Sequence, residues 1–157
     1  MKTVFFLCTA SDRDDAQELQ DYLQGKLRKS ADVRNITGTL AEKRNVEWTL
    51  RNSDCIVLVA SPQASSLIKS KWQETKGRFV TFDGKFVHEE FKENQRLVEK
   101  LIVVFLSERT ENDWIPSGVD EKRIFNLQGE RIRVGNPALT HLEYTVRRVL
   151  GETALDW

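Results

Sequence analysis

An acidic group of side chains follows the first apolar stretch of this chain and could bind a metal ion. Asp12, Asp14 and Asp15 are of the residue type that holds Mg²⁺ in a phosphotransfer receiver. Such a receiver also needs an acceptor aspartate at the end of its third strand, whereas Ser61 and Pro62 stand at the matching place here. Carboxylates in a first helical turn are in addition favoured by the helix dipole. The pattern therefore favours a helix start over a metal site.

A second acidic pair, Glu89 and Glu90, stands beside His88 at the start of a helix predicted over residues 86–98. We expect this helix near the carboxyl edge of the sheet, where open α/β folds place their functional groups. Two interpretations are open at this point. The carboxylates either occupy a dipole-favoured helix start on a solvated face, or one of them acts on a substrate.

Motifs for other chemistry are missing from the sequence. No phosphate-binding Walker loop and no glycine-rich dinucleotide turn occurs. His88 and His141 are the only histidines, and neither has a partner at zinc-ligand spacing. Cys8 and Cys55 fall in predicted central strands, where thiols usually act as small buried hydrophobes. We predict no metal and no cofactor, and a reducing, cytoplasmic setting.

Three unbroken apolar runs, rich in β-branched or aromatic residues, cover 3–9, 54–62 and 101–107. Runs of this kind are typical of strands that are buried on both faces of a parallel sheet. Helical patterns lie between them, so the sequence predicts an α/β domain with its functional surface at the carboxyl ends of the strands. Those ends lead into residues 9–12, 61–66 and 107–114.

Several further elements are predicted from local patterns. Ser11 is expected to cap a helix, and Asn136 with Pro137 is expected to begin the last one. A short strand is expected at 33–36, and a helix is favoured over a strand within 37–52. Residues 62–85 are expected to be a functional loop or partly helical. Segments 124–127 and 131–134 are either two strands or one edge strand and a loop.

Composition limits the function classes. The 157 residues suit one domain, and the 24 basic and 24 acidic side chains balance, whereas a dedicated nucleic-acid binder would show a basic excess. No apolar run approaches the roughly 20 residues that cross a bilayer. The apolar start is too short for a signal peptide and is interpreted as the first strand. We therefore expect no nucleic-acid partner and no direct membrane insertion.

In order along the chain, segments 48–61, 86–91, 100–105 and 114–116 resemble the Toll/interleukin-1 receptor (TIR) superfamily. The chain is most similar to the SEFIR branch, found in interleukin-17 receptor tails and their cytosolic adaptor. The shared features are a tryptophan ahead of the third strand, a long insertion after Ser61-Pro62, and a Val-Phe strand that leads to Ile115-Pro116. TIR domains usually carry a Pro-Gly signature after the second strand, whereas the matching segment here has Gly38 without proline.

The resemblance implies a three-layer domain over residues 1–151, with about five parallel strands flanked by helices, and a short tail at 152–157. It implies an intracellular signalling module of innate immunity that acts by homotypic protein–protein interaction. The implied partners are SEFIR- or TIR-type domains of a receptor or adaptor, including a second copy of this chain. Candidate contact residues come from two segments: Gly38, Lys43, Arg44 and Trp48 from the first, and Lys69, Lys71, Trp72, Lys76 and Arg78 from the second. Trp72 is alternatively a lid over the core.

The resemblance also implies an enzymatic alternative. Some TIR domains cleave the nicotinamide–ribose bond of NAD with a glutamate that follows an aromatic-x-His motif. Phe86-Val87-His88-Glu89-Glu90 is similar and places that glutamate at Glu90, with NAD as substrate. A carboxylate there could stabilise a developing ribosyl cation, as carboxylates do in glycoside cleavage.

Overall fold

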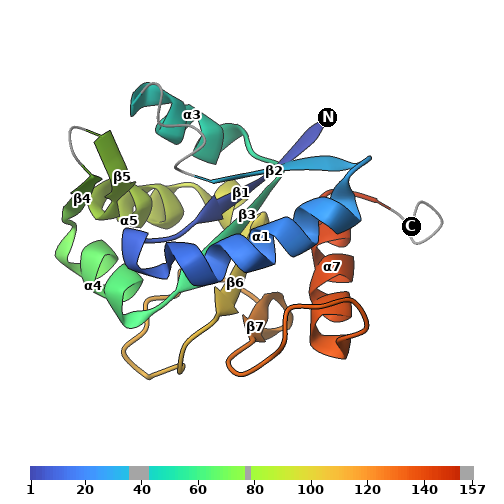
Figure 1. Cartoon of the computed structure of the whole chain (residues 1–157). Helices are drawn as coiled ribbons and strands as arrows, with labels where there is room; N and C mark the ends of the chain where they lie inside the picture. Colours follow the sequence, from blue (N-terminus) through green and yellow to red (C-terminus); the bar gives the residue numbers. More distant parts are fainter. Residues whose placement is uncertain (36–42, 77–78, 153–157) are drawn as a thin grey trace.

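Five parallel strands form the central sheet of this protein, in the order β2-β1-β3-β6-β7 (Figure 1). The apolar runs predict a parallel sheet, and the resemblance implies its five strands. The structure, a computed structural model, describes residues 1–35, 43–76 and 79–152. The sheet strands are β1 Lys2–Leu7, β2 Ala31–Asn35, β3 Cys55–Ala60, β6 Leu101–Phe105 and β7 Ile124–Asn126. A separate antiparallel hairpin pairs β4 Gln73–Lys76 with β5 Phe79–Asp83.

Helices cover both faces of the sheet, which gives three layers. The α-helices are α1 Arg13–Leu27, α3 Lys43–Asn52, α4 Pro62–Ser70, α5 Gly84–Glu93, α6 Gln95–Glu99 and α7 Pro137–Val149. Two 3₁₀ turns, η1 Ala10–Asp12 and η2 Glu121–Arg123, precede α1 and β7. Within the described ranges, no helix has the length and apolar character needed to cross a membrane.

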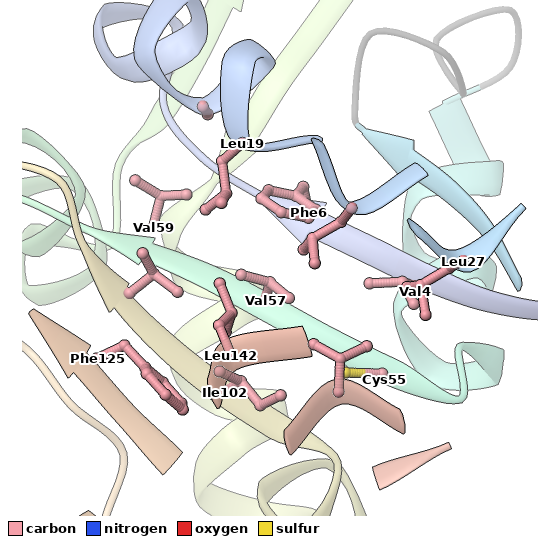
Figure 2. Packing of buried hydrophobic residues seen from close by; sticks show 14 of the residues in the cluster. Val4, Phe6, Leu19, Leu27, Cys55, Val57, Val59, Ile102, Phe125 and Leu142 are labelled. Carbon is pink, nitrogen blue, oxygen red and sulfur yellow. The ribbon is translucent and has the colours of Figure 1, made fainter. Parts of the chain in front are cut away.

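Successive side chains of the central strands point to opposite faces of the sheet. Each strand therefore contributes side chains to two buried clusters, one on each face. On the first face, Val4, Val57 and Ile102 pack with Leu19 of α1 and Leu142 of α7 (Figure 2). We call this the α1/α7 face. It is closed by the two longest helices of the described chain, which lie along the strands.

The opposite face is covered by shorter pieces, and we call it the α5 face. Ile56, Leu58 and Val103 pack there with Ile68 of α4 and Val87 of α5. The connection from β6 to β7 returns over this face largely without helix or strand, with Trp114, Ile115 and Val119 against the cluster. The hairpin β4–β5 stands beside α4 and α5 at the rim (Figure 1).

Most local predictions are confirmed. The helix favoured within 37–52 is α3, and its expected first part, 37–42, lies outside the described residues. The segment 124–134 is one edge strand, β7, followed by a loop. The last helix begins as expected, because the Asn136 side chain accepts a hydrogen bond from the Ala138 N–H at 2.9 Å and Pro137 takes the first position.

Two predicted helix boundaries are wrong. Ser11 does not cap α1, because residues 10–12 form a 3₁₀ turn and the helix begins only at Arg13. The helix predicted over 86–98 begins at Gly84 and is broken at Asn94 into α5 and α6. The Asn94 side chain accepts from the Arg96 N–H at 3.2 Å, and this local bond begins the second helix.

Candidate functional site

Two tryptophans stand out on the α5 face because most of their surface is open to solvent. The exposed fraction is 64% for Trp48, on α3, and 69% for Trp72, which follows α4. Trp72 is therefore not a lid over the core. Large aromatic side chains usually lie inside or in an interface, so two of them this exposed mark a candidate docking surface.

The backbone around Trp72 is held rigidly against the first turn of α5. The Trp72 N–H donates to the Leu67 carbonyl at 3.1 Å, and the Gly84 N–H donates to the Trp72 carbonyl at 2.7 Å. A Cβ on Gly84 would lie only 2.1 Å from the Leu67 oxygen, so only glycine allows this close approach. The Trp72 side chain therefore projects from a fixed junction of α4 and α5.

Trp48 belongs to the element that borders α5 on its other side. Arg51 lies one turn after Trp48 on α3, and its guanidinium carbon is 5.3 Å from the centre of the Phe86 ring on α5. Trp48 and Trp72 thus stand on two elements that both contact the first turns of α5. We call Trp48, Arg51, Phe86, Lys71 and Trp72 the tryptophan surface.

The other predicted contact residues differ in how much the structure describes of them. The Lys69 ammonium donates to the Asn112 carbonyl, so this lysine ties α4 to the loop after β6. Lys71 is exposed and ends α4 in a left-handed conformation with φ +58°. Three further lysines and arginines are placed only by their backbone elements: Lys43 and Arg44 in α3, and Lys76 in β4. Gly38 and Arg78 lie outside the described residues.

Glu90, the candidate catalytic carboxylate, forms an ion pair. Its Oε1 accepts from Nη2 of Arg51 at 2.7 Å and from Nε at 3.1 Å. This hydrogen bond, and then the negative charge of Glu90, raise the pKa of Arg51. Arg51 comes four residues before β3, so the pair lies toward the amino ends of the strands. The geometry shows Glu90 joining α5 to α3, away from the carboxyl edge where the sequence predicted it.

The carboxyl ends of β1 and β3 meet as expected, in a closed polar cluster. The hydroxyls of Thr9 and Ser61 donate to Oδ2 of Asp12 at 2.8 and 2.5 Å. The Ser61 oxygen also accepts from the Ala64 N–H at 3.0 Å and so caps α4. Across the described chain, no three metal-binding side chains gather into a group that could hold an ion. Asp12 therefore acts here as the link between two strand ends.

The two cysteines are free thiols in places that suppress their reactivity. Burial, followed by the charge of Asp12, raises the pKa of Cys8 to about 11. Cys55 is fully buried in β3, and its pKa is raised by that burial. Both thiols stay protonated near neutral pH, whereas only the deprotonated thiolate is a nucleophile.

No family model and no curated protein matches this chain. The tryptophan surface is therefore the feature of the molecule that bears on function. Two residues of the tryptophan surface, Arg51 and Phe86, were not predicted from the sequence as contact residues. A signal for Arg51 was present, because it follows Trp48 by three residues and therefore shares its helix face.

Proposed function

We propose that this protein is a signalling module that docks a SEFIR- or TIR-type domain, including a second copy of itself, through the tryptophan surface. The exposure of Trp48 and Trp72 is the observation that carries this proposal. Burying two indole rings on a partner removes a large apolar area from water. Tryptophan is also enriched among the few residues that supply most of the binding energy of protein interfaces.

The surface charges favour an acidic partner face. Lys71 stands exposed next to Trp72, and Arg51 keeps half of its side-chain surface exposed while it is paired with Glu90. The outer side of α1, on the opposite face of the sheet, carries exposed carboxylates at Asp14, Asp15, Glu18 and Asp21. A second copy could therefore offer α1 to the tryptophan surface, which gives a head-to-tail contact rather than a symmetric one.

The indole contribution is tested by substituting Trp48 and Trp72 with alanine. Self-association is measured by sedimentation over a range of protein concentrations. It should weaken by about thirtyfold for whichever tryptophan the partner buries more deeply, because hot-spot truncations cost about 2 kcal/mol. Melting should be unchanged, since both side chains are exposed in the free domain. Val134→Ser is the matched control, because Val134 is 71% exposed beside the other face of the sheet. Equal loss with Val134→Ser would contradict the proposal.

The charge contribution is tested with Lys71→Glu. Lys71 is preferable to Lys69, because Lys69 also holds the loop after β6 through Asn112. The variant should slow association and weaken pull-down of SEFIR- or TIR-type domains, more strongly at low salt. Unchanged pull-down of each such partner, and unchanged self-association, would remove this surface from consideration.

A further inference from the structure

A second candidate site lies on another flank of α5, facing the irregular connection between β6 and β7. A cavity of about 550 Å³ opens there between α5 and residues 114–118. We propose that it binds a small aromatic carboxylate. The volume is within the range of about 300–1,000 Å³ that small-molecule sites occupy. This inference is independent of the proposed docking function.

Helical spacing places one set of α5 side chains toward the cavity. His88, Phe91 and Lys92 lie at intervals of three and four residues, so they share one side of the helix, and all three line the cavity. Glu90 is two residues from His88, which corresponds to about 200° around an α-helix. The cavity and the Arg51–Glu90 pair therefore use different flanks of α5.

The wall of the cavity is aromatic and held in place. The rings of Phe91 and Trp114 meet edge to face with centroids 6.1 Å apart, and His88 lies 6.3 Å from Trp114. The backbone N–H of Trp114 donates to the Ser65 hydroxyl at 2.8 Å, which holds this part of the connection against α4. Flat, preformed aromatic walls favour a flat aromatic ligand.

The polar groups at the cavity favour an anion. Among the described residues that line it, Lys92 is the one permanently charged side chain, and Ser117 and Gln95 add a hydroxyl and an amide. Nδ1 of His88 is buried and has no hydrogen-bond partner in the described structure. A buried polar atom without a partner calls for an explanation such as a bound ligand.

The test uses benzoate as the probe, with the whole chain in solution. Benzoate titration should shift the NMR signals of the Trp114 indole and the His88 ring, with a Kd on the order of 1 mM for a ligand of this size. Benzamide lacks the charge and acetate lacks the ring, so each should bind several-fold more weakly. Lys92→Met should weaken benzoate binding about fivefold, as the loss of a partly exposed charge contact does.

Matched variants decide the outcome. Lys85→Met is the control for Lys92→Met, because it removes an exposed lysine from the same helix without touching the cavity. His88→Ala removes part of the cavity wall and should also weaken benzoate binding, and His141→Ala is its control. Both controls should bind benzoate as the unaltered chain does. The proposal is overturned if Trp114 and His88 signals stay in place at about 10 mM benzoate. It is equally overturned if benzamide binds as well as benzoate, or if Lys92→Met and Lys85→Met behave alike.

Discussion

The two faces of the sheet are built from the same strands but covered in different ways. The α1/α7 face is closed by two long, regular helices. Its most buried charge, Arg147, is paired with Glu143 and Glu152, and its Nη2 also donates to the Lys26 carbonyl at 2.8 Å. The α5 face is covered by short helices, a hairpin and irregular chain. It carries both exposed tryptophans, the half-exposed Arg51 and the cavity beside His88.

We interpret the α1/α7 face as the scaffold of the domain and the α5 face as its recognition surface. Long helices can bury an apolar stripe along their whole length and turn mostly polar and charged side chains outward. Short elements meet at junctions, and junctions leave projecting side chains and gaps that a partner or ligand can fill. We therefore expect substitutions of buried residues on the α1/α7 face to change stability alone. Substitutions on the outside of the α5 face, or of the exposed α1 carboxylates that a second copy would offer to it, should change binding.

The largest expected effect tests whether both faces are equally necessary for folding. Val57 points to the α1/α7 face and Val103 to the α5 face, and both are fully buried. Aspartate at either position places an unpaired charge in the core, which costs more than about 5 kcal/mol and so about the whole stability of a domain. Circular dichroism should show both variants unfolded, and Val134→Asp, at an exposed position, folded. A soluble Val103→Asp chain that melts cooperatively would contradict the buried-sheet assignment.

The second-largest expected effect is a loss of stability from a substitution on the α1/α7 face, which leaves binding unchanged. Arg147→Met removes the guanidinium that pairs with Glu143 and Glu152, each of which keeps only 13% of its side-chain surface exposed. Breaking a mostly buried network of this kind should lower the free energy of unfolding by about 3 kcal/mol. Denaturant unfolding measures the change, and the exposed neighbour Arg148→Met is the control. Partner binding by the folded fraction should stay as it was, and a binding defect would show that the two faces are not separate.

Alanine substitutions at two glycines should change the free energy of unfolding by smaller amounts, with a loss on the α5 face and a gain on the α1/α7 face. Alanine at Gly84 would place its Cβ against the backbone of Leu67, so α5 must shift, and we expect a loss of about 2 kcal/mol. Gly25 lies in α1 with no atom within 4 Å of the added Cβ, so Gly25→Ala should gain about 0.5–1 kcal/mol of helix propensity. Denaturant unfolding measures both. Gly84→Ala should also weaken docking, because it moves the junction that holds Trp72.

The sequence predicted the sheet and the scaffold face well. The apolar runs at 3–9, 54–62 and 101–107 are each long enough to identify a buried strand, and Asn136 with Pro137 is a local helix signal. These features depend on neighbours in the chain or on burial alone.

The α5 face was harder to predict because long-range contacts decide it. The hairpin in 62–85 is fixed by Glu74, whose carboxylate accepts from the Ala10 N–H, and by the packing of Gly84 on Leu67. The connection after β6 is held by Ser65 and by Arg123, which donates to the carbonyls of residues 98 and 99. Arg51 and Glu90 pair across 39 residues. No local pattern contains this information.

The smallest expected effect on stability separates the docking proposal from NAD cleavage. Glu90→Gln removes the charge that Arg51 pairs with, and Arg51 is half-exposed, so melting should fall only slightly. The exposed neighbour Glu89→Gln is the matched control. If Glu90 serves to join α3 to α5, nicotinamide release from NAD should be the same for both variants and the unaltered chain, at low and at high protein concentration.

The enzymatic alternative gives a different pattern in the same experiment. A positioned carboxylate that stabilises a developing cation contributes several kcal/mol to the barrier, so its loss should slow release by about a hundredfold or more. Release should then also increase with protein concentration if assembly completes the site. Nicotinamide release that Glu90→Gln abolishes and Glu89→Gln retains would establish Glu90 as catalytic. It would also require the Arg51 contact to open, because that contact now holds the carboxylate against α3.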